Sequence, residues 1–110
     1  MAFAGVAREK FIVTHGQLSI FASSAIAERG FCSACGTPLT YRGIMGARIS
    51  VTLGSLDDPD AVVPESQLGL EARVSWLPAA LSLPSVRVDA WLASKNIADA
   101  GSRQHPDRET

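Results

Sequence analysis

The sequence has 110 residues, the length of a single domain with a modest core. Hydrophobic residues make up 46% of it and charged residues 19%, a composition that excludes a wholly disordered protein. The 10 basic and 11 acidic residues leave a net charge of -1 and form no basic stripe, so we expect no nucleic-acid partner.

The sequence also carries no signal for a membrane. No apolar run reaches the ~18 residues that a membrane span needs. The first seven residues lack the basic leader of a signal peptide, and Arg8-Glu9-Lys10 interrupts their apolar character. We therefore expect a cytoplasmic protein with reduced thiols and no membrane partner.

In chain order, the predicted elements are mostly short strands with a period-two hydrophobic pattern. Residues 10–14 and 18–21 flank His15-Gly16-Gln17, which predicts a hairpin around a turn that contains glycine. Further strands are predicted at residues 26–31, 39–42, 48–53 and 68–76. With about six strands and no long helix, the sequence predicts a mainly β fold.

The remaining segments are predicted to be irregular or helical. Residues 55–65 form a loop whose Asp57, Asp58 and Asp60 allow two interpretations: an oxygen-ligand metal site, or a turn in which carboxylates accept from local backbone N–H groups, which we favour. Residues 86–97 predict a short helix in an otherwise irregular C-terminal segment. We assign residues 1–98 to one domain and residues 99–110 to a frayed polar tail.

The chemistry of the sequence concentrates in its two cysteines. Cys32 and Cys35 are spaced C-x-x-C and are followed by Gly36, a residue that permits the positive φ of a metal-binding turn. Three interpretations are open: a redox pair, two reduced structural cysteines, or half of a zinc site. We favour zinc, because a strand pattern rather than a helix follows the pair. The two histidines, His15 in the predicted turn and His105 in the tail, are most simply solvated.

Residues 28–39, which contain Gly30-Phe31-Cys32-Ser33-Ala34-Cys35-Gly36, resemble the second zinc knuckle of the glutathione-dependent formaldehyde-activating enzyme family, which includes centromere protein V. The resemblance continues through residues 51–60 and ends near residue 77. It implies an Mss4-like fold, a sandwich or tent of short antiparallel strands. It also implies zinc as cofactor and carbon–sulfur lyase chemistry on a glutathione–formaldehyde adduct.

The family pattern places zinc ligands in three cysteine segments, and only Cys32 and Cys35 match them here. In the family these two positions belong to a structural zinc, whereas a separate Cys-x-Cys-x-x-Cys segment holds the proposed catalytic ion. No residue of this sequence matches that segment, so we assign no catalytic residue. Residues 67–69 also differ from the His-Ile-aromatic stretch that many members carry. We interpret the chain as a truncated domain of the family.

Three functions are compatible with this pattern. The first is lyase activity inherited with the family, which implies a glutathione-type substrate. The second is a non-catalytic zinc module in which two chains meet knuckle to knuckle, so that a homodimer shares one Cys₄ zinc. The third is a metal-free domain with a binding or scaffolding role.

Five further side chains have competing interpretations. Trp76 and Trp91 are expected to be core or interface anchors rather than substrate platforms. An anionic ligand would suit a group of arginines near the knuckle, although we favour solvated strand faces for them. These are Arg29, Arg42 and Arg48.

Overall fold

The computed structural model describes residues 1–103. The chain divides into two units, of which one comprises residues 1–65 and the other residues 66–102. His105 and most of the predicted tail lie in residues 104–110, outside the described part. No helix within residues 1–103 is long and apolar enough to cross a membrane.

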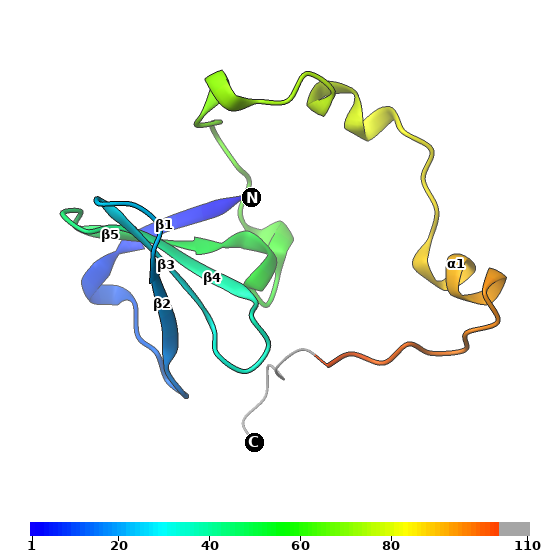
Figure 1. Ribbon diagram of the computed structural model, residues 1–110, viewed down its shortest axis with the longest axis horizontal. Helices are drawn as coiled ribbons and strands as arrows, with labels where there is room; N and C mark the ends of the chain where they lie inside the picture. The colour runs from blue at the N-terminus through cyan, green and yellow to red at the C-terminus, as the bar shows by residue number, and fades with distance from the viewer. Residues whose placement is uncertain (104–110) are drawn as a thin grey trace. The chain divides into compact units, whose positions relative to one another are not determined.

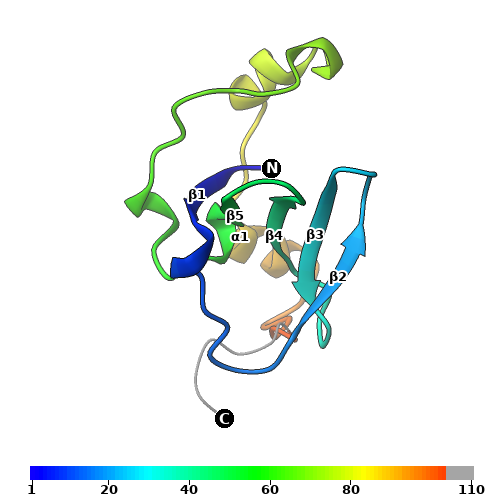
Figure 2. The same cartoon turned by 90° about the vertical axis from the view of Figure 1, so that its left-hand side faces the viewer.

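The first unit is built around one antiparallel sheet (Figure 1). Its strands are β1 (Phe3–Ala7), β2 (Leu18–Ala22), β3 (Ala27–Cys32), β4 (Pro38–Gly43) and β5 (Arg48–Thr52). They lie in the order β1-β5-β4-β3-β2, which Figure 2 shows from edge to edge. The mainly β prediction is therefore confirmed, with five strands in the described chain.

The three central strands follow from local patterns in the sequence. In β5 the side chains of Ile49 and Val51 point to one face and those of Ser50 and Thr52 to the other. The strands β3 and β4 form a hairpin whose turn carries the cysteine pair, with a register shift between Gly30 and Phe31. The strands predicted at 26–31, 39–42 and 48–53 are thus confirmed.

The connection of residues 8–17 corrects the predicted hairpin around Gly16. Residues 11–14 form no strand, and β2 pairs with β3 instead. The chain leaves β1 at one edge, forms the 3-10 turn η1 (Arg8–Lys10), and reaches the opposite edge at β2 (Figure 2). Gly16, at a φ of 66°, bends this connection rather than closing a hairpin.

The first strand, β1, was not predicted from the sequence. It contains two alanines and a glycine, so its hydrophobic alternation is weak. It forms because β5 offers a free edge: Phe3 pairs with Thr52 and Ala7 with Arg48. Backbone hydrogen bonds from Arg8 N–H to the Ala47 carbonyl and from Leu53 N–H to the Ala2 carbonyl extend this pairing at both ends.

The strand predicted at residues 68–76 is wrong. This segment contains the 3-10 turn η4 (Leu70–Ala72), which begins after Gly69 at a φ of 84°. Its backbone hydrogen bonds are local, as from Ala72 N–H to the Gly69 carbonyl. Two further elements complete the second unit, η5 (Leu77–Ser82) and the helix α1 (Val88–Ser94).

The helix α1 confirms the short helix predicted at residues 86–97. It ends in a Schellman motif, in which Ile97 N–H donates to the Leu92 carbonyl and Asn96 N–H to the Ala93 carbonyl. Asn96 supplies the left-handed residue of this motif at a φ of 58°. Trp91 on the helix and Trp76 before η5 are exposed, so neither is a core anchor in the described chain. Their interface role stays a prediction.

The buried core is small and lies in the sheet unit. Its hydrophobic members are Ala27, Ile49 and Leu53, and the polar residues Thr40 and Thr52 are buried with them. The Thr52 hydroxyl donates to the Pro38 carbonyl across 2.9 Å, which satisfies it and ties β5 to the start of β4.

Candidate functional site

The cysteine pair lies in the tight turn between β3 and β4. Gly36 N–H donates to the Cys32 carbonyl at 2.8 Å, and Cys32 N–H donates to the Thr37 carbonyl at 2.9 Å. Gly36 adopts a φ of 78°, which glycine accommodates without strain. Both cysteines are half-buried thiols. The Cys35 Sγ lies 3.1 Å from the Thr37 Oγ1. The sequence therefore folds here into the kind of turn that a zinc knuckle requires.

The turn supplies two possible thiolate ligands, whereas a structural zinc takes four. Among residues 1–103 no group of three or more His, Cys, Asp or Glu side chains is placed to hold a metal ion. Zinc therefore fits the donor set of the turn, but the described residues of one chain do not complete its coordination.

Other side chains that could ligate a metal lie in local turns. His15 is exposed, and its Nδ1 lies 3.2 Å from the Thr14 Oγ1. The Asp58 carboxylate accepts from Asp60 N–H at 3.1 Å and caps the 3-10 turn η3 (Pro59–Ala61). The favoured interpretation of this acidic loop as a turn is confirmed at Asp58.

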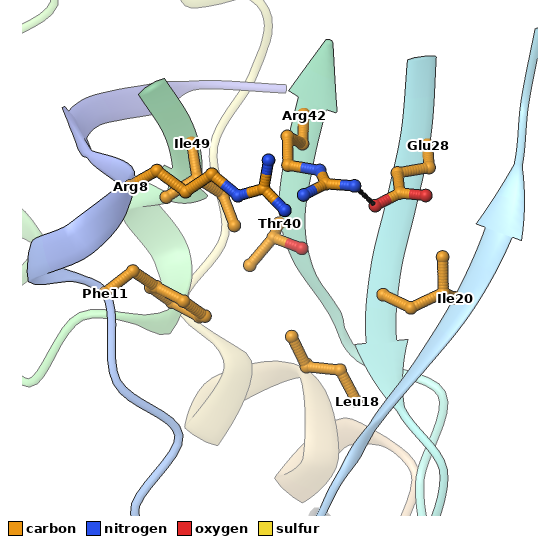
Figure 3. Close-up of a pocket in the computed structure, with 8 residues that line it drawn as sticks. All are labelled: Arg8, Phe11, Leu18, Ile20, Glu28, Thr40, Arg42 and Ile49. Carbon is orange, nitrogen blue, oxygen red and sulfur yellow. Dashed lines mark ion pairs between the residues drawn. The ribbon is translucent and has the colours of Figure 1, made fainter. Parts of the chain in front are cut away.

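A second feature is a pocket of about 230 Å³ on one face of the sheet (Figure 3). Side chains from β2, β3, β4 and β5 line it, together with two from the connection that follows β1. These residues are Arg8, Phe11, Leu18, Ile20, Glu28, Thr40, Arg42 and Ile49. The cross-strand register places Glu28 opposite Arg42, so both project from the same face.

Charged groups of both signs meet in this pocket. The Arg42 Nη2 forms an ion pair with the Glu28 Oε1 at 2.5 Å, and both side chains are largely shielded, at 18% and 23% exposure. The Arg42 Nε is buried and has no hydrogen-bond acceptor among residues 1–103. Arg42 is therefore not on a solvated strand face, which corrects that expectation.

The other two arginines singled out from the sequence are exposed, as expected. Alternation along the strands places them on the opposite face of the sheet. The Arg29 guanidinium lies over the ring of Tyr41, 4.9 Å from its centroid. Arg48 donates from Nη2 to the Gly5 carbonyl at 2.6 Å.

Gly30 lies opposite two lining residues of the pocket, Ile20 on β2 and Thr40 on β4. A Cβ at this position would come within 2.2 Å of the Thr40 Oγ1 and within 3.4 Å of the Leu18 and Ile20 methyl groups. A residue without a side chain in the middle of β3 therefore leaves room for three of the lining side chains. Sequence reasoning identified Arg42 but missed the pocket, because Arg8 and Phe11 reach it only through the connection to β2. The Glu28–Arg42 pair could have indicated the pocket, because a β3–β4 hairpin closed by the cysteine turn places these two residues opposite each other.

Comparison with known proteins identifies the family of the chain. No curated protein and no solved structure matches it. A family model described as glutathione-dependent formaldehyde-activating enzyme matches residues 1–71, the whole sheet and the cysteine turn included. Because this match spans more than half of the 110 residues, the chain belongs to the glutathione-dependent formaldehyde-activating enzyme family.

Proposed function

We propose that this chain is a zinc-binding member of its family, in which Cys32 and Cys35 supply two thiolates to one zinc ion. The observation that carries the proposal is the turn itself. Its two backbone hydrogen bonds and the left-handed Gly36 hold the cysteines on one short loop between β3 and β4. Thiolates are favoured zinc ligands, and a C-x-x-C turn presents two of them to one ion. Reduced thiols of this kind suit a cytoplasmic location, which we include in the proposal.

We further propose that a second copy of the chain supplies the other two thiolates. Ser33, Ala34 and Gly36 are exposed, so the tip of the turn is accessible to a partner. A two-fold axis through the ion would bring two identical turns together and give a Cys₄ site. The resulting homodimer would be a non-catalytic module stabilised by its metal.

Native mass spectrometry of untagged protein purified without added metal tests both steps at once. We expect one zinc per two chains, and loss of zinc and of the dimer together in Cys32→Ser. The matched control is Ser33→Ala, which changes an exposed residue of the same turn and should keep both. A zinc-free chain would contradict zinc binding. One zinc per monomer would contradict the shared site.

A second candidate function follows from the family match over residues 1–71. Members of this family are named for activating formaldehyde with glutathione, so a glutathione-type adduct is the corresponding substrate. The described residues of one chain do not complete a metal site, and we assign no catalytic residue. The test is NMR detection of carbon–sulfur bond formation or cleavage with glutathione and formaldehyde. A rate equal to the spontaneous reaction would exclude this function for the chain.

A further inference from the structure

We propose that the pocket on the face of the sheet, lined by side chains of β2, β3, β4 and β5, binds the carboxylate of a small organic acid. The acid's short hydrocarbon part would lie against the apolar wall. This inference is independent of the zinc proposal, because neither cysteine lines the pocket. It assigns a ligand class to a site on the face of the sheet rather than at the turn.

The first argument is the charge of the lining. Arg8 and Arg42 contribute two positive charges, whereas Glu28 contributes one negative charge. Figure 3 shows the two guanidinium groups turned toward one another above Thr40. The repulsion between them is offset only in part by Glu28, so the pocket retains an excess positive charge that favours an anion.

The second argument is hydrogen bonding. Glu28 accepts from one terminal nitrogen of Arg42, and the buried Arg42 Nε has no acceptor within the described part of the chain. The guanidinium of Arg8 forms no ion pair or hydrogen bond with any residue of the described range. A planar carboxylate can accept from two guanidinium N–H groups at once, which a spherical anion cannot do. The Thr40 hydroxyl, which lies beneath the arginines in Figure 3, offers a further donor.

The third argument is the opposite wall. Phe11, Leu18, Ile20 and Ile49 line it with hydrocarbon. An inorganic anion would leave this wall without a partner, whereas the chain of an organic acid would cover it. The volume of about 230 Å³ suits a ligand of only a few carbons. It favours a free small acid over the C-terminus of a macromolecule.

The experiment is an NMR titration of the full chain with acetate, propionate and butyrate at constant ionic strength. The backbone amides and the arginine Nε–H signals report the site directly. We expect butyrate to shift the Arg42 and Arg8 Nε–H signals while those of Arg29 and Arg48, on the other face, stay in place. Affinity should rise by about fourfold with each methylene that enters the apolar part. Butyramide, which has the same shape without the charge, should not bind.

Three variants test the roles of the lining residues. Arg8→Gln, at an exposed position, should weaken butyrate binding by about tenfold, since it removes a charged donor. Glu28→Gln should strengthen binding by about threefold, because a competing carboxylate is lost. Arg29→Gln is the matched control and should leave the affinity unchanged. The amide spectrum of each variant verifies that the sheet is intact.

Several outcomes would overturn the proposal. Equal shifts at all four arginines would indicate ionic screening without a site. Equal binding of butyrate and butyramide would remove the role of charge. Tighter binding by a peptide with a free C-terminus than by butyrate would replace the small acid with a protein partner.

Discussion

The two units of the chain differ in what surrounds their alternating hydrophobic residues. In the sheet unit, Ile49 of β5 is only 7% exposed, and strands pair with β5 on both sides. In the second unit, Leu68 begins an equally regular alternation yet is fully exposed, and no strand forms there. The same period-two pattern therefore gives opposite results in the two units.

The difference lies in backbone pairing. A strand leaves N–H and C=O groups along its edges that need partners, and β5 obtains them from β1 and β4. Residues 68–76 have no paired neighbour and satisfy part of their backbone through local 3-10 turns. Alternation thus selects which face of a strand is buried, but a neighbouring strand is needed to make the strand.

The largest contrast is expected from truncating one apolar side chain in each unit. Ile49→Ala removes a buried side chain from the small core and should lower the free energy of unfolding by about 2–4 kcal/mol. Leu68→Ala removes an exposed side chain and should change it by less than about 0.5 kcal/mol. Urea unfolding of the two variants measures both values. Equal losses would mean that residues 66–102 bury a core of their own.

A smaller effect is expected at Gly30, which lies between side chains that line the pocket. Gly30→Ala places a Cβ within 2.2 Å of the Thr40 Oγ1, so a buried side chain must move, at a cost of about 1–3 kcal/mol. The control is Gly54→Ala, where no atom lies within 4 Å of the new Cβ and φ is not positive. Thermal unfolding should separate the two variants. A Gly30→Ala protein as stable as its control would show that Thr40 can rearrange freely.

The sequence predicted those parts of the fold that are local. The strands β3, β4 and β5 and the turn at Cys32 and Cys35 follow from alternation and from the glycine after the second cysteine. The hairpin at Gly16 was wrong because the same bend serves a connection that leads to the opposite edge of the sheet. The strand β1 was missed because its formation depends on the distant edge of β5 rather than on its own residues.

The two candidate sites, the cysteine turn and the pocket, also differ in how far the sequence predicts them. The cysteine turn is local, and its geometry could be predicted from the spacing of its residues. The pocket brings together eight residues between positions 8 and 49, from four strands and a connection. Its lining therefore depends on the topology of the sheet. Of the lining residues, only Arg42 was a candidate from the sequence. Its ion pair with Glu28 depends on the register of β3 and β4. Long-range pairing, which the sequence does not encode in any short pattern, explains what was missed.

In the second unit, the left-handed residue that follows α1 tests how the C-terminal end of the helix is held. Asn96 holds a left-handed conformation, which alanine adopts at a cost of about 1 kcal/mol. Asn96→Ala should therefore reduce the helix content of residues 88–94, whereas Asn96→Gly should preserve it. The amide exchange rates of α1 measure the difference. Equal exchange in both variants would mean that contacts other than the Schellman motif hold the helix end.

The smallest effect is expected at the other end of α1, from an exposed ion pair. The Arg87 guanidinium donates to the Asp89 carboxylate, and its Nη2 lies 3.0 Å from the Asp89 Oδ2. This interaction, together with a hydrogen bond from Ala90 N–H, holds the pKa of Asp89 below its ordinary value. A lowered pKa means that the folded helix favours the carboxylate, so this stabilisation is present above the unfolded pKa of about 3.9 and is lost as the pH falls through the folded value. Carboxyl NMR titration should place the pKa of Asp89 higher in Arg87→Gln than in the unaltered chain. Because both groups are exposed, added salt should reduce that difference. Identical titration curves in the two proteins would show that the pair does not persist in solution.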